Sequence, residues 1–183
     1  MNTIKIAAAL LAPCLFAMGG AAHAATDDMK PYLEGSYAWP KMETSGFSAT
    51  AGVGIVRAGI NFDRFVALEA FGAFGTSDAN GGVYGIPVSL KLNSAYGAYI
   101  KGQYPVAPHF ELFVRAGWLH ASVEVTDKYY GLSGSSSDSS FSYGGGVQVP
   151  FGNGWYAQGD YMSYYSKNSD SIRGLSVGLG YRF

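Results

Sequence analysis

The last twelve residues of the sequence constrain its fold more than any other stretch. From Ile172 to Phe183 they read IRGLSVGLGYRF, so leucine, valine, tyrosine and phenylalanine alternate with glycine, serine and arginine. A period of two is typical of a β-strand, whose successive side chains point to opposite faces. One face is therefore apolar and ends in two aromatic residues. A soluble sandwich strand also alternates, but it turns its apolar face inward, whereas in a transmembrane barrel that face contacts lipid.

Eight segments of the chain alternate in this way, and the strand just described is the last of them. They span residues 31–39, 47–62, 65–75, 84–104, 110–125, 141–151, 155–165 and 172–183. Short turns and longer polar stretches connect them in alternation. The turns lie at residues 62–65, 105–109 and 152–154, and the polar stretches at residues 40–45, 76–82, 127–140 and 166–171.

This layout predicts a membrane barrel. A chain that crosses a membrane must satisfy its backbone polar groups within itself, which only helices and closed sheets can do. After the first 24 residues no apolar stretch approaches the roughly 20 residues that a spanning helix needs. The sequence therefore predicts an all-β fold, an eight-stranded antiparallel up-and-down transmembrane barrel with short periplasmic turns and longer extracellular loops.

The N-terminus predicts export. Lys5 precedes an apolar run from Ile6 to Met18, and Ala22-His23-Ala24 fits the small-x-small pattern before a cleavage site. We expect residues 1–24 to be a cleaved signal peptide and residues 25–183 to form a barrel domain in the Gram-negative outer membrane. Without Lys5, 11 of the 12 basic side chains remain against 13 acidic ones. This balance provides no footprint for a nucleic-acid partner.

Eight charged residues fall on the face opposite the apolar one. They are Glu34, Arg57, Glu69, Lys101, Glu111, Arg115, Asp160 and Arg182. Four are acidic and four are basic, and buried charges persist only when they are paired. We therefore predict a charge network inside the barrel, in which Glu34 is a plausible partner of Arg182 once the sheet closes. The network could be a salt-bridged plug or could line an ion path.

Several large apolar residues also fall on the predicted inner face. They are Phe71, Phe113, Leu119, Tyr156 and Met162. Either these side chains pack inside the barrel, or a β-bulge resets the alternation near the outer rim. The sequence leaves both alternatives open.

Three stretches resemble a known family. They are Ala58–Phe71 (AGINFDRFVALEAF), Phe141–Val149 (FSYGGGVQV) and Ser171–Phe183 (SIRGLSVGLGYRF). They resemble the small eight-stranded outer-membrane proteins of the OmpX/Ail and OmpA-barrel kind, with an opacity-type outer membrane protein β-barrel domain. The resemblance implies insertion by the barrel-assembly machinery, which reads an aromatic C-terminus, so Tyr181 and Phe183 would form the assembly signal.

The resemblance further implies roles in envelope integrity, adhesion or host interaction. Relative to OmpX the loops look short, so we expect no long protruding strands. We also expect no peptidoglycan-binding domain after the barrel, because the sequence ends at Phe183.

Catalytic residues are sparse, which favours a non-enzymatic protein. A hydrolase needs a histidine, a nucleophilic serine and a carboxylate within hydrogen-bond reach. His120, Ser122 and Glu124 share one face of one strand, but each step of two residues separates them by about 7 Å. The sequence shows no metal-ligand cluster or phosphate loop, and we expect no cofactor. A small passive ion channel and a lipid-A-modifying barrel enzyme remain the alternative functions.

The polar stretch at residues 127–140 is a candidate surface-binding loop, with Lys128, Tyr129 and Tyr130 near its start. A flexible solvated connector is the other interpretation. Basic residues towards the outer rim could meet phosphates of lipopolysaccharide, and these are Lys41, Lys128, Lys167 and Arg173. Expected partners are outer-membrane lipid and lipopolysaccharide, the assembly machinery, and an unidentified host or envelope ligand, with the protein as a monomer.

Overall fold

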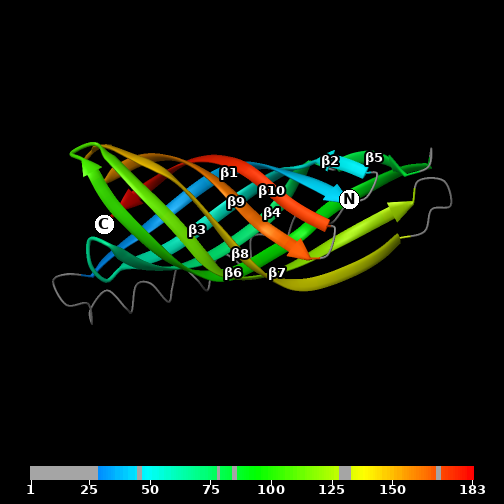
Figure 1. Ribbon diagram of the computed structural model, residues 1–183, viewed down its shortest axis with the longest axis horizontal. Coiled ribbons are helices and arrows are strands. Elements are labelled where there is room, and N and C mark those ends of the chain that lie inside the picture. Colours follow the sequence, from blue (N-terminus) through cyan, green and yellow to red (C-terminus); the bar gives the residue numbers. More distant parts are fainter. Residues whose placement is uncertain (1–28, 45–46, 78, 84–85, 128–132, 168–169) are drawn as a thin grey trace, which may run out of the picture.

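The computed structural model describes residues 29–44, 47–77, 79–83, 86–127, 133–167 and 170–183 as one closed antiparallel sheet (Figure 1). The sheet closes because β1 pairs with β3 on one side and with β10 on the other. Its strands are β1 (Lys30–Thr44), β2 (Phe47–Thr50), β3 (Gly52–Asn61), β4 (Val66–Ser77), β5 (Ala79–Val83), β6 (Ile86–Ala107), β7 (Phe110–Asp127), β8 (Ser133–Gly152), β9 (Trp155–Lys167) and β10 (Asp170–Arg182).

Eight of these strands form the barrel wall, which confirms the predicted eight-stranded up-and-down fold. The two short strands, β2 and β5, pair only with the ends of β1 and β6 and add to the rim. In the part of the chain that the structure describes, no helix is long and apolar enough to cross a membrane. The predicted signal peptide lies outside the described residues.

One end of the barrel, called the turn end below, carries the tight turns and both ends of the described sheet. After β3, the Asp63 carboxylate accepts hydrogen bonds from the backbone amides of Phe65 and Val66, at 2.6 and 2.7 Å. Between β8 and β9, Asn153 adopts a φ of 49° between two glycines that also have positive φ. Asparagine and glycine tolerate a positive φ, and an aspartate side chain commonly accepts hydrogen bonds from backbone amides of its own turn. The residue types therefore predict both turns. Lys30 and Phe183 lie at the same end.

At the opposite end, called the loop end, several strands are longer than predicted. β1 continues to Thr44, and β8 begins at Ser133, so residues 40–44 and 133–140 are strands and not loops. The pairing of β7 with β8 runs out to Thr126 and Ser133, whereas that of β8 with β9 ends at Tyr143. The β7–β8 hairpin therefore extends beyond the neighbouring β9 (Figure 1). The expectation of no protruding strands is wrong, because a polar sequence can be a strand when both faces meet water.

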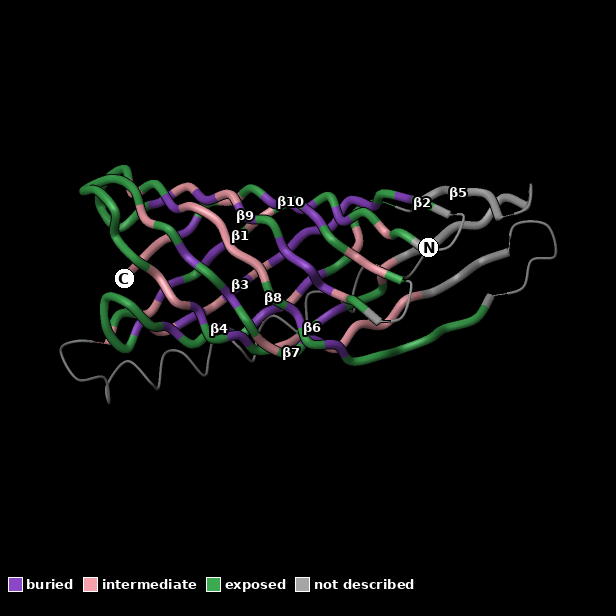
Figure 2. The backbone as a smooth tube through the Cα atoms, viewed as in Figure 1, coloured by how far each residue is buried: buried purple, intermediate pink, exposed green. Residues whose placement is uncertain are grey.

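The two faces of the wall alternate along each strand (Figure 2). The outer face is apolar, with exposed aliphatic side chains such as Leu68, Ile100 and Leu179 between two aromatic belts. The belt at the turn end comprises Phe62, Phe65, Tyr104, Phe110, Phe151, Trp155, Tyr181 and Phe183. The belt at the loop end comprises Tyr37, Trp39, Phe74, Tyr96, Trp118, Phe141, Tyr143 and Tyr161. Paired aromatic belts around an apolar band are typical of membrane barrels.

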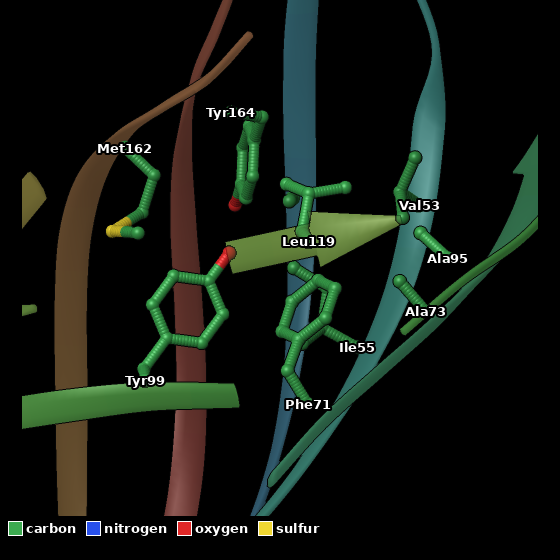
Figure 3. Close-up of a cluster of buried hydrophobic side chains, with 10 residues drawn as sticks. Val53, Ile55, Phe71, Ala73, Ala95, Tyr99, Leu119, Met162 and Tyr164 are labelled. Carbon is green, nitrogen blue, oxygen red and sulfur yellow. The ribbon is translucent and has the colours of Figure 1, made fainter. Parts of the chain in front are cut away.

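The large apolar residues of the predicted inner face do pack inside the barrel. Phe71, Phe113, Leu119, Tyr156 and Met162 are all buried. The register shifts of the described strands lie at other positions, so the alternation at these five residues is not reset. Toward the loop end, an apolar layer lines the interior (Figure 3). It consists of Ala38, Val53, Ile55, Phe71, Ala73, Ala95, Tyr99, Leu119, Met162 and Tyr164.

Candidate functional site

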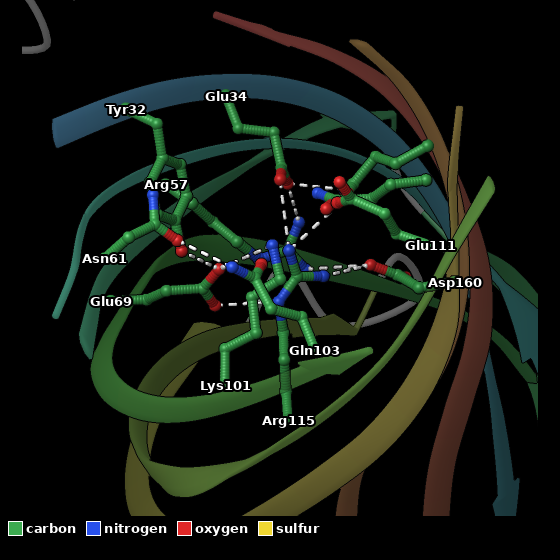
Figure 4. A network of polar contacts seen from close by, with 12 residues as sticks. Tyr32, Glu34, Arg57, Asn61, Glu69, Lys101, Gln103, Glu111, Arg115 and Asp160 are labelled. Atoms are coloured by element: carbon green, nitrogen blue, oxygen red, sulfur yellow. Dashed lines mark hydrogen bonds and ion pairs between the residues drawn. The ribbon is translucent and has the colours of Figure 1, made fainter. Parts of the chain in front are cut away.

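The interior between the turn end and the apolar layer holds a cluster of charged side chains, centred on Arg115 of β7 (Figure 4). Its guanidinium donates from Nε to Glu69 at 2.7 Å, from Nη1 to Asp160 at 2.7 Å and from Nη2 to Glu34 at 3.0 Å. These carboxylates come from β4, β9 and β1. A planar guanidinium can hold three acceptors at once because its donors point in fixed, divergent directions. Arg115 thus ties together strands from around the wall.

Two further cations complete the cluster. Arg57 of β3 donates from Nη1 to Glu34 at 2.7 Å, and its Nη2 lies 3.6 Å from Asp160. The Lys101 ammonium of β6 lies 3.9 Å from Glu69. Its nitrogen also lies about 5 to 6 Å from three ring centroids, which is cation–π range. These rings are Tyr32 and Phe113 at 5.0 Å and Tyr156 at 5.9 Å. Each cation is therefore compensated.

Neutral polar side chains add further hydrogen bonds to the three carboxylates. The Tyr32 hydroxyl donates to Glu69, the Gln158 amide to Glu34 and the Ser176 hydroxyl to Asp160, each at 2.5 Å. These residues were not singled out from the sequence. Strand alternation nevertheless places each of them on the same strand face as a predicted lumen charge, and that pattern could have identified them. We call the six charged residues Glu34, Arg57, Glu69, Lys101, Arg115 and Asp160 the plug.

The plug is sealed from water and balanced in charge. Each of its six residues is at most 3% exposed, and three acidic side chains face three basic ones. Glycines on the inner face make room for the rings that flank it, because a Cβ at Gly59 or Gly180 would overlap the ring of Tyr32 or Tyr156. Removing one member of such a network leaves an uncompensated buried charge, which is strongly destabilising.

All eight predicted lumen charges lie inside the barrel, but the remaining two form a separate pair. Arg182 of β10 donates both terminal nitrogens to Glu111 of β7, at 3.1 and 2.5 Å. The predicted contact between Arg182 and Glu34 is wrong. In the β1–β10 register, Arg182 lies opposite Tyr32, two residues closer to the turn end than Glu34. Its guanidinium accordingly lies over the Tyr156 ring, 4.9 Å from the ring centroid, on the turn-end side of the plug.

A histidine–serine contact lies on the outside of the wall near the loop end. His120 Nδ1 is 2.9 Å from the Ser139 hydroxyl on the neighbouring strand β8, and the His120 ring lies 5.2 Å from that of Tyr96. The sequence placed His120 with Ser122 on one strand, and the cross-strand partner emerges only from the β7–β8 register. The described residues contain no group of three or more side chains suited to a metal ion.

The remaining predicted residues lie at the two ends of the barrel. Lys41 and Arg173 are register neighbours on β1 and β10, both exposed at the loop end. The Tyr181 ring lies 5.2 Å from Trp155 and 5.1 Å from Phe183, at the turn end. The candidate surface-binding residues Lys128, Tyr129 and Tyr130 lie outside the described residues.

Comparison with known proteins adds a family model and several solved barrels. A model described as "Outer membrane protein beta-barrel domain" matches residues 8–183. Ail, the attachment invasion locus protein of Yersinia pestis, solved with the heparin analogue sucrose octasulfate, is 16% identical with a TM-score of 0.64, over 85% of this chain and 99% of that chain. Comparison with the curated proteins gives no match.

Two further solved barrels have similar folds. Neisserial surface protein A is 16% identical with a TM-score of 0.66, over 84% of this chain and 97% of that chain. The N-terminal barrel domain of Pseudomonas aeruginosa OprF is 12% identical with a TM-score of 0.61, over 83% of this chain and 97% of that chain. Identities this low establish the shared fold alone.

Proposed function

This chain belongs to the outer membrane protein beta-barrel domain family, and on that premise we propose that it is a sealed, non-enzymatic barrel that presents a rigid hairpin at the cell surface. The family resides in the Gram-negative outer membrane, so the turn end faces the periplasm and the loop end faces outside. The plug is the observation that carries the proposal. It favours a structural or surface-interaction role over transport.

An ion path through the lumen would have to pass the plug. Arg115 holds three carboxylates at hydrogen-bond distance, and its charged neighbours are as deeply buried as it is. Opening a passage would separate these pairs in a low-dielectric interior, where unpaired charges are costly. The passive-channel alternative therefore requires a rearrangement of the whole cluster.

Planar-bilayer recordings test the sealed lumen. We expect the purified protein to be silent across both voltage polarities. Heat-modifiable migration of the same preparation on a gel controls for folding. Conductance that disappears when Arg57 or Arg115 is neutralised would establish a channel and refute the plug.

The surface role is supported by the β7–β8 hairpin, which continues as a paired ribbon to Thr126 and Ser133. A paired ribbon on a sealed barrel presents its residues at lower entropic cost than a flexible loop. The hairpin can be shortened by deleting residues 123–136 and joining Ser122 to Ser137 through Asn-Gly. This keeps Ser122 and Ser137 as register partners. We expect this variant to insert normally and to lose adherence of expressing cells to host-cell or matrix surfaces. A variant with residues 128–132 scrambled is the control for hairpin length. Unchanged adherence of the shortened variant would contradict the surface role.

Lipopolysaccharide is the proposed lipid partner at the loop end. Lys41 and Arg173 adjoin each other on the outer face, one outward step above Trp39 and Leu175 of the apolar band. Cations at this level can meet phosphates of the outer leaflet. We expect Lys41→Gln combined with Arg173→Gln to reduce the lipopolysaccharide that copurifies with the barrel, relative to Lys30→Gln at the periplasmic end. Equal amounts would contradict the assignment.

Assembly supplies a further test. We propose that Phe183, next to Tyr181 in the periplasmic aromatic belt, is read by the barrel-assembly machinery. Deleting Phe183 should lower the amount of folded protein in the membrane more than Arg182→Ala does. Equal membrane levels of the two variants would count against this role.

The enzymatic alternative has one observation in its favour, the His120–Ser139 contact of 2.9 Å. A histidine within reach of a serine hydroxyl is the first part of a nucleophilic site, and its position near the outer leaflet would suit a lipid substrate. If the barrel modified lipid A, expression of the wild type but not of Ser139→Ala would change the lipid-A mass profile. We expect identical lipid-A profiles from both, because His120 also packs against the tilted ring of Tyr96 as an ordinary cross-strand contact.

A further inference from the structure

The outer half of the lumen contains a cavity of about 290 Å³, on the loop-end side of the plug. All eight strands of the wall contribute lining residues, so the cavity is enclosed on its sides and separated from the membrane. Phe71 lies at the junction with the plug, and the Arg57 guanidinium packs 5.5 Å from its ring centroid. The cavity is therefore bounded by the wall on its sides and by the plug toward the turn end, and we call it the cup.

The chemistry of the cup is unusual for the lumen of an outer-membrane barrel, which is generally polar. Its lining is mostly alanine, valine, isoleucine, leucine, phenylalanine and methionine, and it includes no lysine or arginine among the described residues. Among the described residues, Asp138 of β8 is the one charged residue of the lining. It is exposed, and its carboxylate accepts a hydrogen bond from the Tyr165 hydroxyl at 3.1 Å. The cup is thus apolar in depth, with an acidic group on the protruding strand.

Small side chains keep this space open. Ala73 and Ala95 are register partners on the adjacent strands β4 and β6, and both line the cavity. Ala38, Ala51 and Ala121 line other parts of it. Protein interiors are normally packed to the density of organic crystals. A cup that served only as hydrophobic core would be better filled by larger aliphatic residues at these positions, so the unfilled volume needs another explanation.

One polar atom in the cup also lacks a partner. Tyr164 lines the cavity and is 9% exposed, and its hydroxyl has no hydrogen bond within the part of the chain that the structure describes. Figure 3 shows this side chain directed into the apolar layer toward Tyr99. A buried hydroxyl without a partner is costly, and a ligand that supplied one would relieve that cost.

We propose that the cup binds one small, neutral hydrophobic molecule that carries a single hydrogen-bonding group. Apolar cavities of about 150 Å³ bind benzene, so this volume suits a one- or two-ring compound or a short alkyl chain. Binding of an anion is disfavoured, because the described lining residues include the acidic Asp138 and no cation. The inference goes beyond the proposed surface role and does not depend on it.

Methyl-resolved NMR of the barrel in detergent micelles tests the proposal, with 1-naphthol as the probe. Ile55 lies in the cup and Ile100 faces the micelle, so the two methyl groups separate binding from partitioning. We expect saturable shifts at Ile55 that are larger than those at Ile100. The matched anion 1-naphthoate should bind about tenfold or more weakly.

Three variants make the test specific. Ala95→Phe should fill the cup and abolish the saturable shift, whereas Ala98→Phe, on the lipid face of the same strand, should leave it unchanged. Tyr164→Phe keeps the volume but removes the hydroxyl, so it should weaken 1-naphthol binding severalfold and leave naphthalene binding unaltered. Ile55 shifts that merely follow those of Ile100, or equal binding of 1-naphthoate, would overturn the proposal.

Discussion

The periplasmic and extracellular halves of the lumen lie on the same eight strands and differ in what fills them. In the periplasmic half, Arg115 and its partners satisfy one another almost completely. In the extracellular half, most lining side chains are apolar, several are alanine, and a cavity of about 290 Å³ remains. One half is therefore closed by its own residues, whereas the other has room for something else.

This difference separates two ways of filling a narrow barrel. A buried charge network is all-or-none, because each member depends on specific partners for its hydrogen bonds. An apolar layer tolerates changes in volume more gradually, at a cost that follows the space created or removed. Substitutions in the two halves should consequently differ in size and in how far a second substitution can repair them.

The largest effect is expected at the centre of the plug. Arg115→Met keeps the side-chain length but leaves three buried carboxylates facing two cations, which should lower the free energy of unfolding by about 3–5 kcal/mol. Urea titration of the barrel in lipid vesicles measures this difference. Adding Glu69→Gln removes the one excess negative charge and should recover part of the loss. A double variant less stable than Arg115→Met alone would contradict the pairing described here.

A smaller loss is expected in the apolar layer. Phe71→Ala removes a buried ring that contacts Tyr99 with a centroid distance of 5.6 Å, and it should cost about 3 kcal/mol. Phe74→Ala, on the lipid face of the same strand, should cost less because lipid tails can occupy the vacated space. Equal losses at the two positions, measured by the same urea titration, would show that packing in the apolar layer stabilises the barrel no more than contact with lipid does.

The partly buried ion pair between Arg182 and Glu111 at the periplasmic end should contribute less stability than the contacts in either half. The side chains of Arg182 and Glu111 are 26% and 17% exposed, so water can hydrate whichever charge is left alone. Arg182→Ala should therefore lower the free energy of unfolding by only about 1 kcal/mol, and by less at high salt. A loss as large as that of Arg115→Met would mean that this pair belongs to the plug.

The sequence predicted which residues face the lumen, because strand alternation depends only on local order. Glu34, Arg57 and Arg115 could thus be assigned to one interior from their positions alone. Their partners could not, since pairing depends on the stagger of distant strands. Arg182 shows this, because it meets Glu111 of β7 and not Glu34 of the adjoining β1. The cross-strand contact of His120 with Ser139 was missed for the same reason.

The loop end was harder to predict for a different reason. The serine-rich residues 133–140 lack the alternation of a half-buried strand, so composition indicated a loop. They form a strand because β7 supplies backbone partners as far as Thr126. Likewise, neither Ala73 nor Ala95 signals a cavity on its own, since the space exists only where the eight strands bring such small residues together.

The smallest expected effect distinguishes the two halves most directly. Ala73→Val adds two methyl groups beside the empty volume and should raise the free energy of unfolding by about 0.5–1 kcal/mol, because it fills space without displacing a partner. Ala70→Val makes the same change on the lipid face of β4 and controls for the strand preference of valine. A gain at Ala73 above that at Ala70 in urea titration would mark the extracellular half as underpacked. If Ala73→Val were instead destabilising while Ala70→Val was neutral, the wall around the cup would be as tightly packed as the plug, and the contrast between the two halves would fail.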